Sequence, residues 1–146
     1  MIPKPIPKPK KKKALGYYKE KAWDMFSKYI RTRDCLATTG TIDEGVCVTC
    51  GQRFSFKELQ AGHAIGQRNN SILFDEELVN AQCGGCNFYR NGEYAKYSVW
   101  FIKRYGLKRW EEKVELSKEL RKYSKNDLIE IREEYKEKLE TLMSNI

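Results

Sequence analysis

The 146-residue sequence lacks any run of about 18 consecutive apolar residues, and its mean hydropathy is −0.72. A membrane-spanning helix is therefore excluded. The N-terminus is positively charged but lacks the apolar core of a secretory signal, so we expect a cytoplasmic protein. Because secretion is not indicated, the five cysteines are better explained as thiolates and a free thiol than as disulfides.

Proline is missing after residue 9. The segment MIPKPIPKPKKKK at 1–13 holds all four prolines and six lysines, which favours an extended chain without a core. We predict a disordered basic arm over 1–14 and a single folded domain over 15–146. Through Lys10, Lys11, Lys12 and Lys13, the arm either adds non-specific affinity for phosphate groups or only keeps the chain soluble.

The net charge of +8 and the pI near 9.2 favour a polyanionic partner. Nucleic acid is the commonest such partner, and an anionic membrane surface comes next. Six of the eight net positive charges lie in the arm, which leaves about +2 for the domain. The folded body is therefore not strongly basic as a whole.

The hydrophobic pattern predicts an α+β fold in which a small strand–strand–helix unit lies inside a mainly helical domain. Apolar positions at helical spacing predict a helix over 15–34, and residues 35–45 are rich in turn formers. The last predicted helix could cover the domain or pair with a second copy, which leaves a homodimer open. The other predicted elements are strands over 58–65 and 78–82, a helix from about 86, and helices over 94–105, about 110–123 and 125–142.

Four cysteines form two CxxC pairs separated by 32 residues, namely Cys47, Cys50, Cys83 and Cys86, while Cys35 stands alone. A CxxC turn lets two sulfurs reach one ion, and zinc accepts four thiolates in a tetrahedron. A redox role is the alternative, but two pairs in one short domain favour coordination. We therefore predict a structural zinc ion whose binding also supports folding.

His63, the only histidine, lies between the two cysteine pairs, and Asn87 directly follows the last cysteine. With four thiolates on the ion, the imidazole is free to act as a general base, although a structural role is the ordinary alternative. The amide oxygen of Asn87 suits Mg²⁺ or Mn²⁺, or else Asn87 only caps a helix. Together these residues predict a zinc-bound ββα-metal nuclease site of the HNH type.

Further site candidates rest on weaker signals. Asn80 is a candidate for holding the imidazole in place through the backbone, or it is an ordinary residue at the end of a strand. Candidate phosphate contacts are Arg68, Arg90 and Lys96, each of which could equally be a solvated surface charge.

The segments AGH at 61–63, FDEELVNAQCGGCN at 74–87 and EEYKEKLETL at 133–142 resemble the Rap/NinG family of phage recombination endonucleases. The similarity covers about residues 23–142 and leaves the arm outside. The cysteine pairs followed by asparagine are also similar to those of phage endonuclease VII. The resemblance implies structure-selective cleavage of branched DNA such as D-loops and Holliday junctions, inside the bacterial host cell of a bacteriophage. Host or phage recombination proteins are further candidate partners.

Many HNH sites place an aspartate before the histidine as a second metal ligand, and Gly62 stands there. Asn87 would then be the main protein ligand, or Asp75 or Glu76 would help. Two other functions stay open: a non-catalytic zinc-knuckle DNA-binding protein, and a sequence-specific HNH nuclease that cuts a linear duplex.

Overall fold

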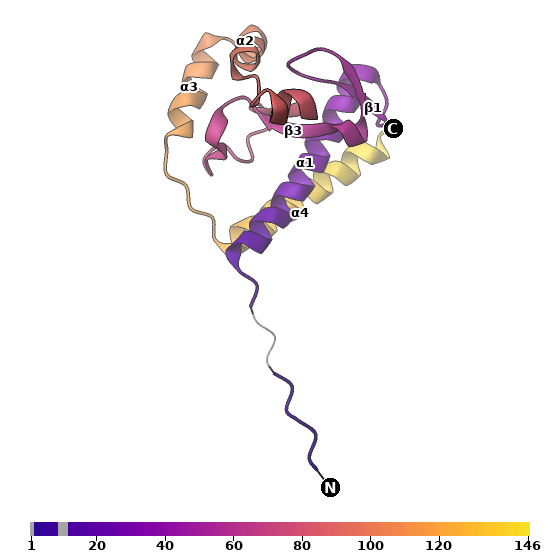
Figure 1. Ribbon diagram of the computed structural model, residues 1–146, viewed down its shortest axis with the longest axis vertical. Coiled ribbons are helices and arrows are strands. Elements are labelled where there is room, and N and C mark those ends of the chain that lie inside the picture. Colours follow the sequence, from indigo (N-terminus) through magenta and orange to yellow (C-terminus); the bar gives the residue numbers. More distant parts are fainter. Residues whose placement is uncertain (1, 9–11) are drawn as a thin grey trace.

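The computed structural model describes residues 2–8 and 12–146 and confirms an α+β architecture (Figure 1). Within this part of the chain, small antiparallel sheets are packed among helices. The α-helices are α1 (Leu15–Thr39), α2 (Tyr94–Tyr105), α3 (Leu107–Ser117) and α4 (Lys125–Ser144). The strands are β1 (Glu44–Val46), β2 (Arg53–Ser55), β3 (Leu59–His63) and β4 (Val79–Cys83). Short helical turns are η1 (Phe56–Glu58), η2 (Gly66–Arg68) and η3 (Gly85–Tyr89).

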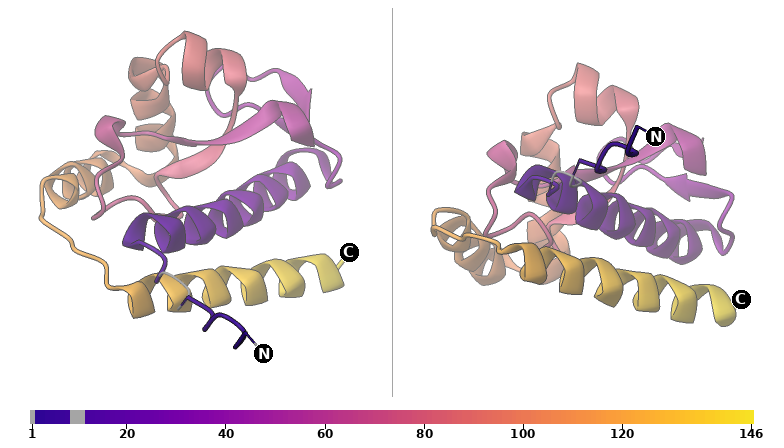
Figure 2. Two further views of the ribbon diagram at one scale, coloured as in Figure 1. Left: turned by 60° about the horizontal axis from the view of Figure 1, so that its bottom comes forward. Right: turned by 90° about the horizontal axis from the view of Figure 1, so that it is seen from below.

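Helix α1 forms the middle layer, with the β3–β4 sheet on one side and α4 on the other (Figure 2). The two helices run side by side in the same direction, as successive contacts from Tyr18–Lys125 to Phe26–Tyr135 show. Phe26 and Ile30 are fully buried and face Ala61 of the sheet within one apolar cluster. The last helix therefore covers the domain of its own chain, one of the two arrangements that the sequence left open.

Helix α1 is longer than expected, because its end is set by backbone geometry rather than by composition. It continues past Asp34 to Thr39, and the hydroxyls of Thr38 and Thr39 donate to carbonyls one turn earlier. Gly40 then adopts a φ of 77°, and its N–H donates to the Leu36 carbonyl. Glycine reaches this left-handed conformation without strain, so it ends the helix.

Strands β3 and β4 pair antiparallel, with Leu59 opposite Cys83 and His63 opposite Val79. The ends of both strands lie within two residues of the ranges predicted from the sequence. The preceding β1–β2 hairpin was not predicted, because each of its strands has only three residues. The prediction of a regular helix from about residue 86 is also wrong, because the chain forms a single π-helical turn there, η3. The next α-helix begins at Tyr94.

The two faces of the β3–β4 sheet pack against different helices because side chains alternate along a strand. Ala61 and Val79 face α1, whereas the opposite face carries Gly62 and Asn80 toward α2. Tyr97 of α2 is fully buried, and its hydroxyl donates to the Gly62 carbonyl at 2.7 Å. Helix α2 ends where Gly106 takes a φ of 95°, and α3 starts directly after it and stops at Ser117, earlier than predicted.

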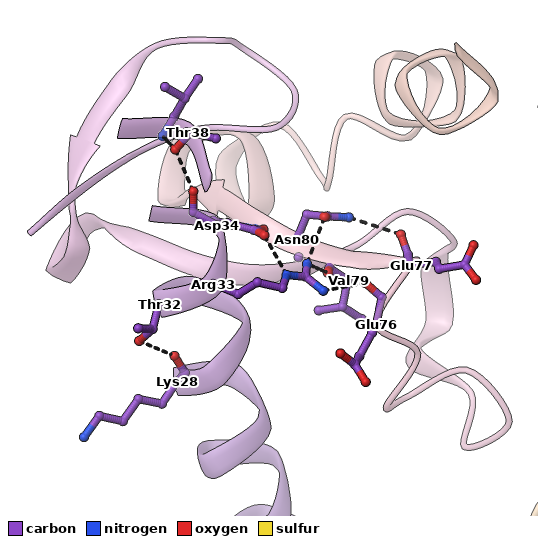
Figure 3. Close-up of polar contacts among 12 residues, drawn as sticks. Lys28, Thr32, Arg33, Asp34, Thr38, Glu76, Glu77, Val79 and Asn80 are labelled. Atoms are coloured by element: carbon purple, nitrogen blue, oxygen red, sulfur yellow. Dashed lines mark hydrogen bonds and ion pairs between the residues drawn. The ribbon is translucent and has the colours of Figure 1, made fainter. Parts of the chain in front are cut away.

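A polar latch fastens α1 to the start of β4, and Figure 3 shows Arg33 reaching from the helix to this segment. The Arg33 guanidinium donates to the carbonyls of Glu76 and Val79 and to Oδ1 of Asn80, at 2.9–3.1 Å. Its Nε pairs with Asp34 at 2.8 Å, and the second carboxylate oxygen of Asp34 accepts the Ala81 N–H. These bonds fix where β4 lies on α1.

The described residues of the arm, 2–8 and 12–14, have no regular secondary structure and are exposed. Lys12 and Lys13 belong to this part, and the Lys13 ammonium lies 4.0 Å from the centre of the Tyr17 ring. Lys10 and Lys11, two of the predicted phosphate contacts, lie outside the described residues. Among the helices that the structure describes, none is long and apolar enough to cross a bilayer.

Replacement of Arg33 by alanine should lower the free energy of unfolding by about 2–4 kcal/mol, because it leaves buried acceptors and the Asp34 carboxylate without their donor. Urea denaturation measures the loss. Arg53→Ala is the matched control, since its ion pair with Glu44 is exposed and should contribute at most about 1 kcal/mol. Equal losses in the two variants would contradict the role given to the latch.

Candidate functional site

The four paired cysteines come together as the sequence predicted. The sulfur atoms of Cys47, Cys50, Cys83 and Cys86 all lie within 4.8 Å of one another, and three of the four residues are buried. Zinc–sulfur bonds of about 2.3 Å give a tetrahedron with edges of about 3.8 Å. The cluster is close to that size, and Cys50 Sγ lies 3.9 Å from Cys83 Sγ. Four thiol ligands in this arrangement could hold one zinc ion.

The cluster joins the β1–β2 hairpin to the segment from β4 to η3, next to hydrogen bonds from Val48 N to the Ala81 carbonyl and from Gln82 Nε2 to the Thr49 hydroxyl. Cys47 and Cys50 lie in the turn of the β1–β2 hairpin, whereas Cys83 ends β4 and Cys86 lies in η3. Backbone N–H groups point at the sulfurs, as where Cys83 N donates to Cys47 Sγ at 3.3 Å. Such bonds stabilise thiolates and orient them toward a metal.

Cys35 is separate from this cluster and has a different environment. It is fully buried beside Leu59 and Ala81, and burial raises the pKa of its thiol to about 11. It therefore packs as a small apolar side chain, which agrees with its prediction as a free thiol.

A cavity of about 590 Å³ opens along β3, and both His63 and Asn87 line it. Among the described residues, three basic side chains and no carboxylate line its wall, a composition that suits an anionic group such as a phosphate. The lining residues are Trp23, Ser27, Arg31, Lys57, Leu59, Gln60, Ala61, His63, Arg68, Asn87 and Tyr94.

His63 is held in a defined orientation at one end of this cavity. Its side chain is 5% exposed, and its ring stacks on Trp23 with centroids 5.2 Å apart. Nε2 lies 3.1 Å from the Leu73 carbonyl oxygen. Because a carbonyl can only accept, Nε2 must carry the hydrogen, and Nδ1 of the neutral ring then holds the free lone pair.

Burial lowers the pKa of His63 to about 4, and the hydrogen bond to Leu73 opposes this shift only in part. The positive charge of Arg68 lowers the pKa further. The imidazole is therefore neutral at pH 7, the state in which it can accept a proton.

Asn87 reaches the same cavity from η3 and lies against β3. Its Nδ2 donates to Oε1 of Gln60 at 2.6 Å. Because the amide nitrogen is used in this bond, the Oδ1 atom is the group left to act as a ligand or acceptor. An amide oxygen is a hard donor of the kind that Mg²⁺ accepts.

Asn80 lies on the opposite face of the sheet from His63. Its Nδ2 donates to the Tyr97 hydroxyl, which in turn donates to the Gly62 carbonyl next to His63. Asn80 lies opposite Gly62 in the strand pairing, but its side chain reaches the Gly62 carbonyl only through Tyr97 and does not line the cavity.

Packing explains why glycine stands before the histidine. A Cβ atom at Gly62 would overlap Oε1 of Gln82, and Gln82 is fully buried between the sheet and the loop before α2. An aspartate at this position would point into that contact and not into the cavity. Asp75 and Glu76 do not replace it: Asp75 pairs with Lys113 at 2.7 Å, and Glu76 pairs with Lys138 at 2.8 Å.

Only one of the three predicted phosphate contacts outside the arm lies on the cavity. Arg68 lines it and stacks over Trp23 at 4.4 Å. Arg90 instead donates to Cys86 Sγ at 3.0 Å, and Lys96 pairs with Glu93 at 3.5 Å. Both lie in the segment after Asn87 and not on the cavity wall.

The sequence did not single out the cavity residues Arg31, Lys57 and Gln60. Arg31 and Lys57 lack any motif, so only the fold could bring them together. Gln60 could have been found from the sequence, because it is a polar residue within the predicted strand that carries His63. Trp23 was assigned to the core, and it packs there while one ring face supports His63.

Removing the cluster should destabilise the domain around the β1–β2 hairpin and η3, because metal binding to these four cysteines would be coupled to folding. Cys83→Ser should lose the bound zinc and several kcal/mol of stability, as metal analysis and thermal unfolding would measure. Cys35→Ala is the control and should keep one zinc ion per chain, because its thiol lies outside the cluster. Full zinc occupancy in Cys83→Ser would contradict the assignment.

The lowered pKa of His63 makes folding sensitive to acid. An unfolded histidine protonates below about pH 6.5, whereas the folded one stays neutral to about pH 4, so stability present above pH 6.5 is lost as the pH falls toward 4. From pH 7 to pH 5, the wild type should lose about 2 kcal/mol more than His63→Gln. Denaturant titrations at both pH values measure this difference, and parallel losses would contradict the buried neutral imidazole.

Comparisons with known proteins give a family for the chain. The family model described as Bacteriophage Lambda NinG protein matches residues 6–145. The match begins within the arm and not near residue 23, so the expectation that the arm lies outside the similarity is wrong. No curated protein and no solved structure matches the chain. A match over almost the whole length establishes membership: the chain belongs to the bacteriophage lambda NinG family, a phage family related to recombination.

Proposed function

We propose that this protein is a metal-dependent DNA endonuclease of the HNH type. The observation that carries the proposal is that His63 and Asn87, from different elements, line one basic cavity next to the cysteine cluster. The sequence of two strands and a turn from β3 to η3 supplies the histidine from the first strand and the asparagine from the turn. A zinc ion on the four cysteines would hold this turn against β3.

His63 is the proposed general base. With its Nε2 hydrogen held by Leu73, the Nδ1 lone pair would take a proton from a water molecule that attacks a phosphodiester. Stacking on Trp23 fixes the plane of the imidazole, so the ring has little rotational freedom left to lose when the water binds. The products would carry 5′-phosphate and 3′-hydroxyl ends.

The basic side chains around the cavity would bind the phosphate. Arg31, Lys57 and Arg68 all line it. Burial lowers the pKa of the Arg31 and Arg68 guanidinium groups without bringing either near neutrality, since arginine stays charged in proteins. These three cations would position the phosphate beside the neutral imidazole of His63 and would stabilise the negative charge that develops in the transition state.

Asn87 is the proposed protein ligand of a Mg²⁺ or Mn²⁺ ion. Gln60 would act as a positioning residue, because it holds the amide nitrogen and leaves Oδ1 toward the ion. When bound, the ion would stabilise the departing 3′ oxygen. No carboxylate lines the cavity among the described residues, so water molecules and the DNA phosphate would complete the coordination.

Branched DNA is the proposed substrate, namely D-loops and Holliday junctions. This choice is supported by the relation of the NinG family to phage recombination. Cleavage at a branch would depend on the shape of the DNA more than on contacts with particular bases. The protein would then act in the infected bacterial cell.

One observation favours a second function, that of a non-catalytic zinc-knuckle DNA-binding protein. His63 is almost completely buried, and its stacking and hydrogen bond would suit a purely structural residue. This reading differs from the first in one measurable respect, since replacing His63 would change stability without removing any strand cleavage.

His63→Ala and Asn87→Ala should each reduce cleavage by about 100-fold or more with little change in DNA binding, because each loses a group that acts on the reacting phosphate. The measurement compares a labelled D-loop, a four-way junction and a linear duplex with Mg²⁺. His63→Gln retains side-chain bulk beside Trp23, and Asn126→Ala, at an exposed position of α4, is the matched asparagine control. Wild-type protein that binds but cuts nothing would favour the non-catalytic reading. Equal cutting of the linear duplex would favour a sequence-specific nuclease.

A further inference from the structure

The exposed aromatic side chains of the described chain are confined to one short segment. The protein has 18 phenylalanine, tyrosine and tryptophan residues, and all of them lie in the described part. Only Phe88, Tyr89 and Tyr94 are exposed, at 72%, 81% and 45% of their surface. A scattered exposed apolar residue needs no explanation, but aromatic rings gathered at one place mark a contact surface.

This segment starts and ends at the cavity of the proposed site. Asn87 and Tyr94 both line the cavity, and Phe88 and Tyr89 lie between them along the chain. Their rings contact each other edge to face, with centroids 5.2 Å apart. Figure 1 shows η3, which carries both rings, following β4 and lying beside β3.

The backbone around the two rings is held firmly, so their exposure is built into the fold. Arg90 N donates to the Gly85 carbonyl at 2.9 Å, and Gly92 N donates to the Cys86 carbonyl at 2.8 Å. Gln82 donates to the Gly92 carbonyl from the buried side. Asn91, Gly92 and Glu93 all have positive φ, and two of these residues are not glycine. Such backbone conformations persist only where the surrounding contacts hold the turn in place.

We propose that Phe88 and Tyr89 form a stacking platform for unpaired or unstacked DNA bases, beside the phosphate cavity. Every base has an aromatic face, so stacking on such rings tolerates any sequence. The cations of the adjacent cavity agree with this occupant, because Arg31, Lys57 and Arg68 all line it. A polyanion with exposed bases satisfies both the apolar rings and the cations.

The inference rests on the proposed nuclease function and adds a reason for structure selectivity. In a continuous duplex the bases are stacked on one another and offer no free face. At a branch point, a gap or a single strand, a base is available to the two rings. Cleavage would then be directed to the phosphate that lies next to the unstacked base.

Binding without a divalent ion tests the platform independently of cutting. The probes are a four-way junction, a gapped duplex and a fully paired duplex of the same sequence, each with 2-aminopurine at the position of the branch or gap. For Phe88→Ala/Tyr89→Ala we expect at least about tenfold weaker binding to the junction and the gapped duplex, and little change on the paired duplex. The change in 2-aminopurine fluorescence that wild type causes should be lost as well.

Matched variants separate stacking from charge and from folding. Phe88→Trp/Tyr89→Phe keeps the rings and should keep wild-type affinity, and Leu120→Ala removes an 89% exposed apolar side chain elsewhere with no effect. Lys57→Ala should lower the salt dependence of binding by about one unit of slope, whereas the aromatic variant should leave that slope unchanged. Zinc content and thermal unfolding establish that each variant is folded.

The outcomes for the platform and for the nuclease can be told apart. Unchanged binding by Phe88→Ala/Tyr89→Ala overturns the platform, even if wild type still cuts in a manner that depends on His63. Loss of self-association in that variant with unchanged DNA binding also overturns it, because the rings would then face a second copy. Selective loss of binding supports the platform even if wild type cuts no substrate, in which case only the nuclease proposal fails.

Discussion

The antiparallel pairing of β3 with β4 is the contact on which the rest of the site depends. Its register sets His63 opposite Val79 and Leu59 opposite Cys83, so the histidine lies at one end of the sheet and a cluster cysteine at the other. A slip by one residue would exchange the two faces and turn His63 toward α2. The Arg33 latch fixes the partner strand β4 on α1, because its guanidinium binds the Glu76 and Val79 carbonyls and Asn80 together.

The sheet is narrow, and this shapes the cavity. Among the described strands, β3 pairs only with β4, so its other edge is open and the cavity forms along it. Helix α1 supplies Trp23 and Arg31 to one side of this edge, while η3 supplies Asn87 to the other. A sheet with a further strand would cover this edge and leave no room for a phosphate. The small size of the sheet is therefore part of the proposed function.

The cysteine cluster and the aromatic rings are linked through η3. Cys86, Asn87, Phe88 and Tyr89 are consecutive, so one short turn carries a cluster ligand, the proposed metal ligand and the proposed base-stacking rings. Because Cys86 is buried in the cluster and Gly92 bonds back to its carbonyl, the turn has little freedom. A metal bound to the cluster would therefore contribute to the site indirectly, by fixing the positions of Asn87 and the two rings relative to β3.

The sequence alone determined the features that depend on local spacing. Two CxxC pairs indicate a four-thiolate cluster wherever the chain brings them together, and helical periodicity located α1, α2 and α4. The tertiary structure decided what depends on contacts between distant segments: the neutral buried state of His63, the hydrogen bond from Asn87 to Gln60, and the Asn80 contact with Tyr97. It also decided that Gly62 packs on Gln82, that Arg90 and Lys96 lie off the cavity, and that Arg31 and Lys57 line it. The physical reason is that an isolated side chain has no fixed burial or partner until packing supplies its surroundings.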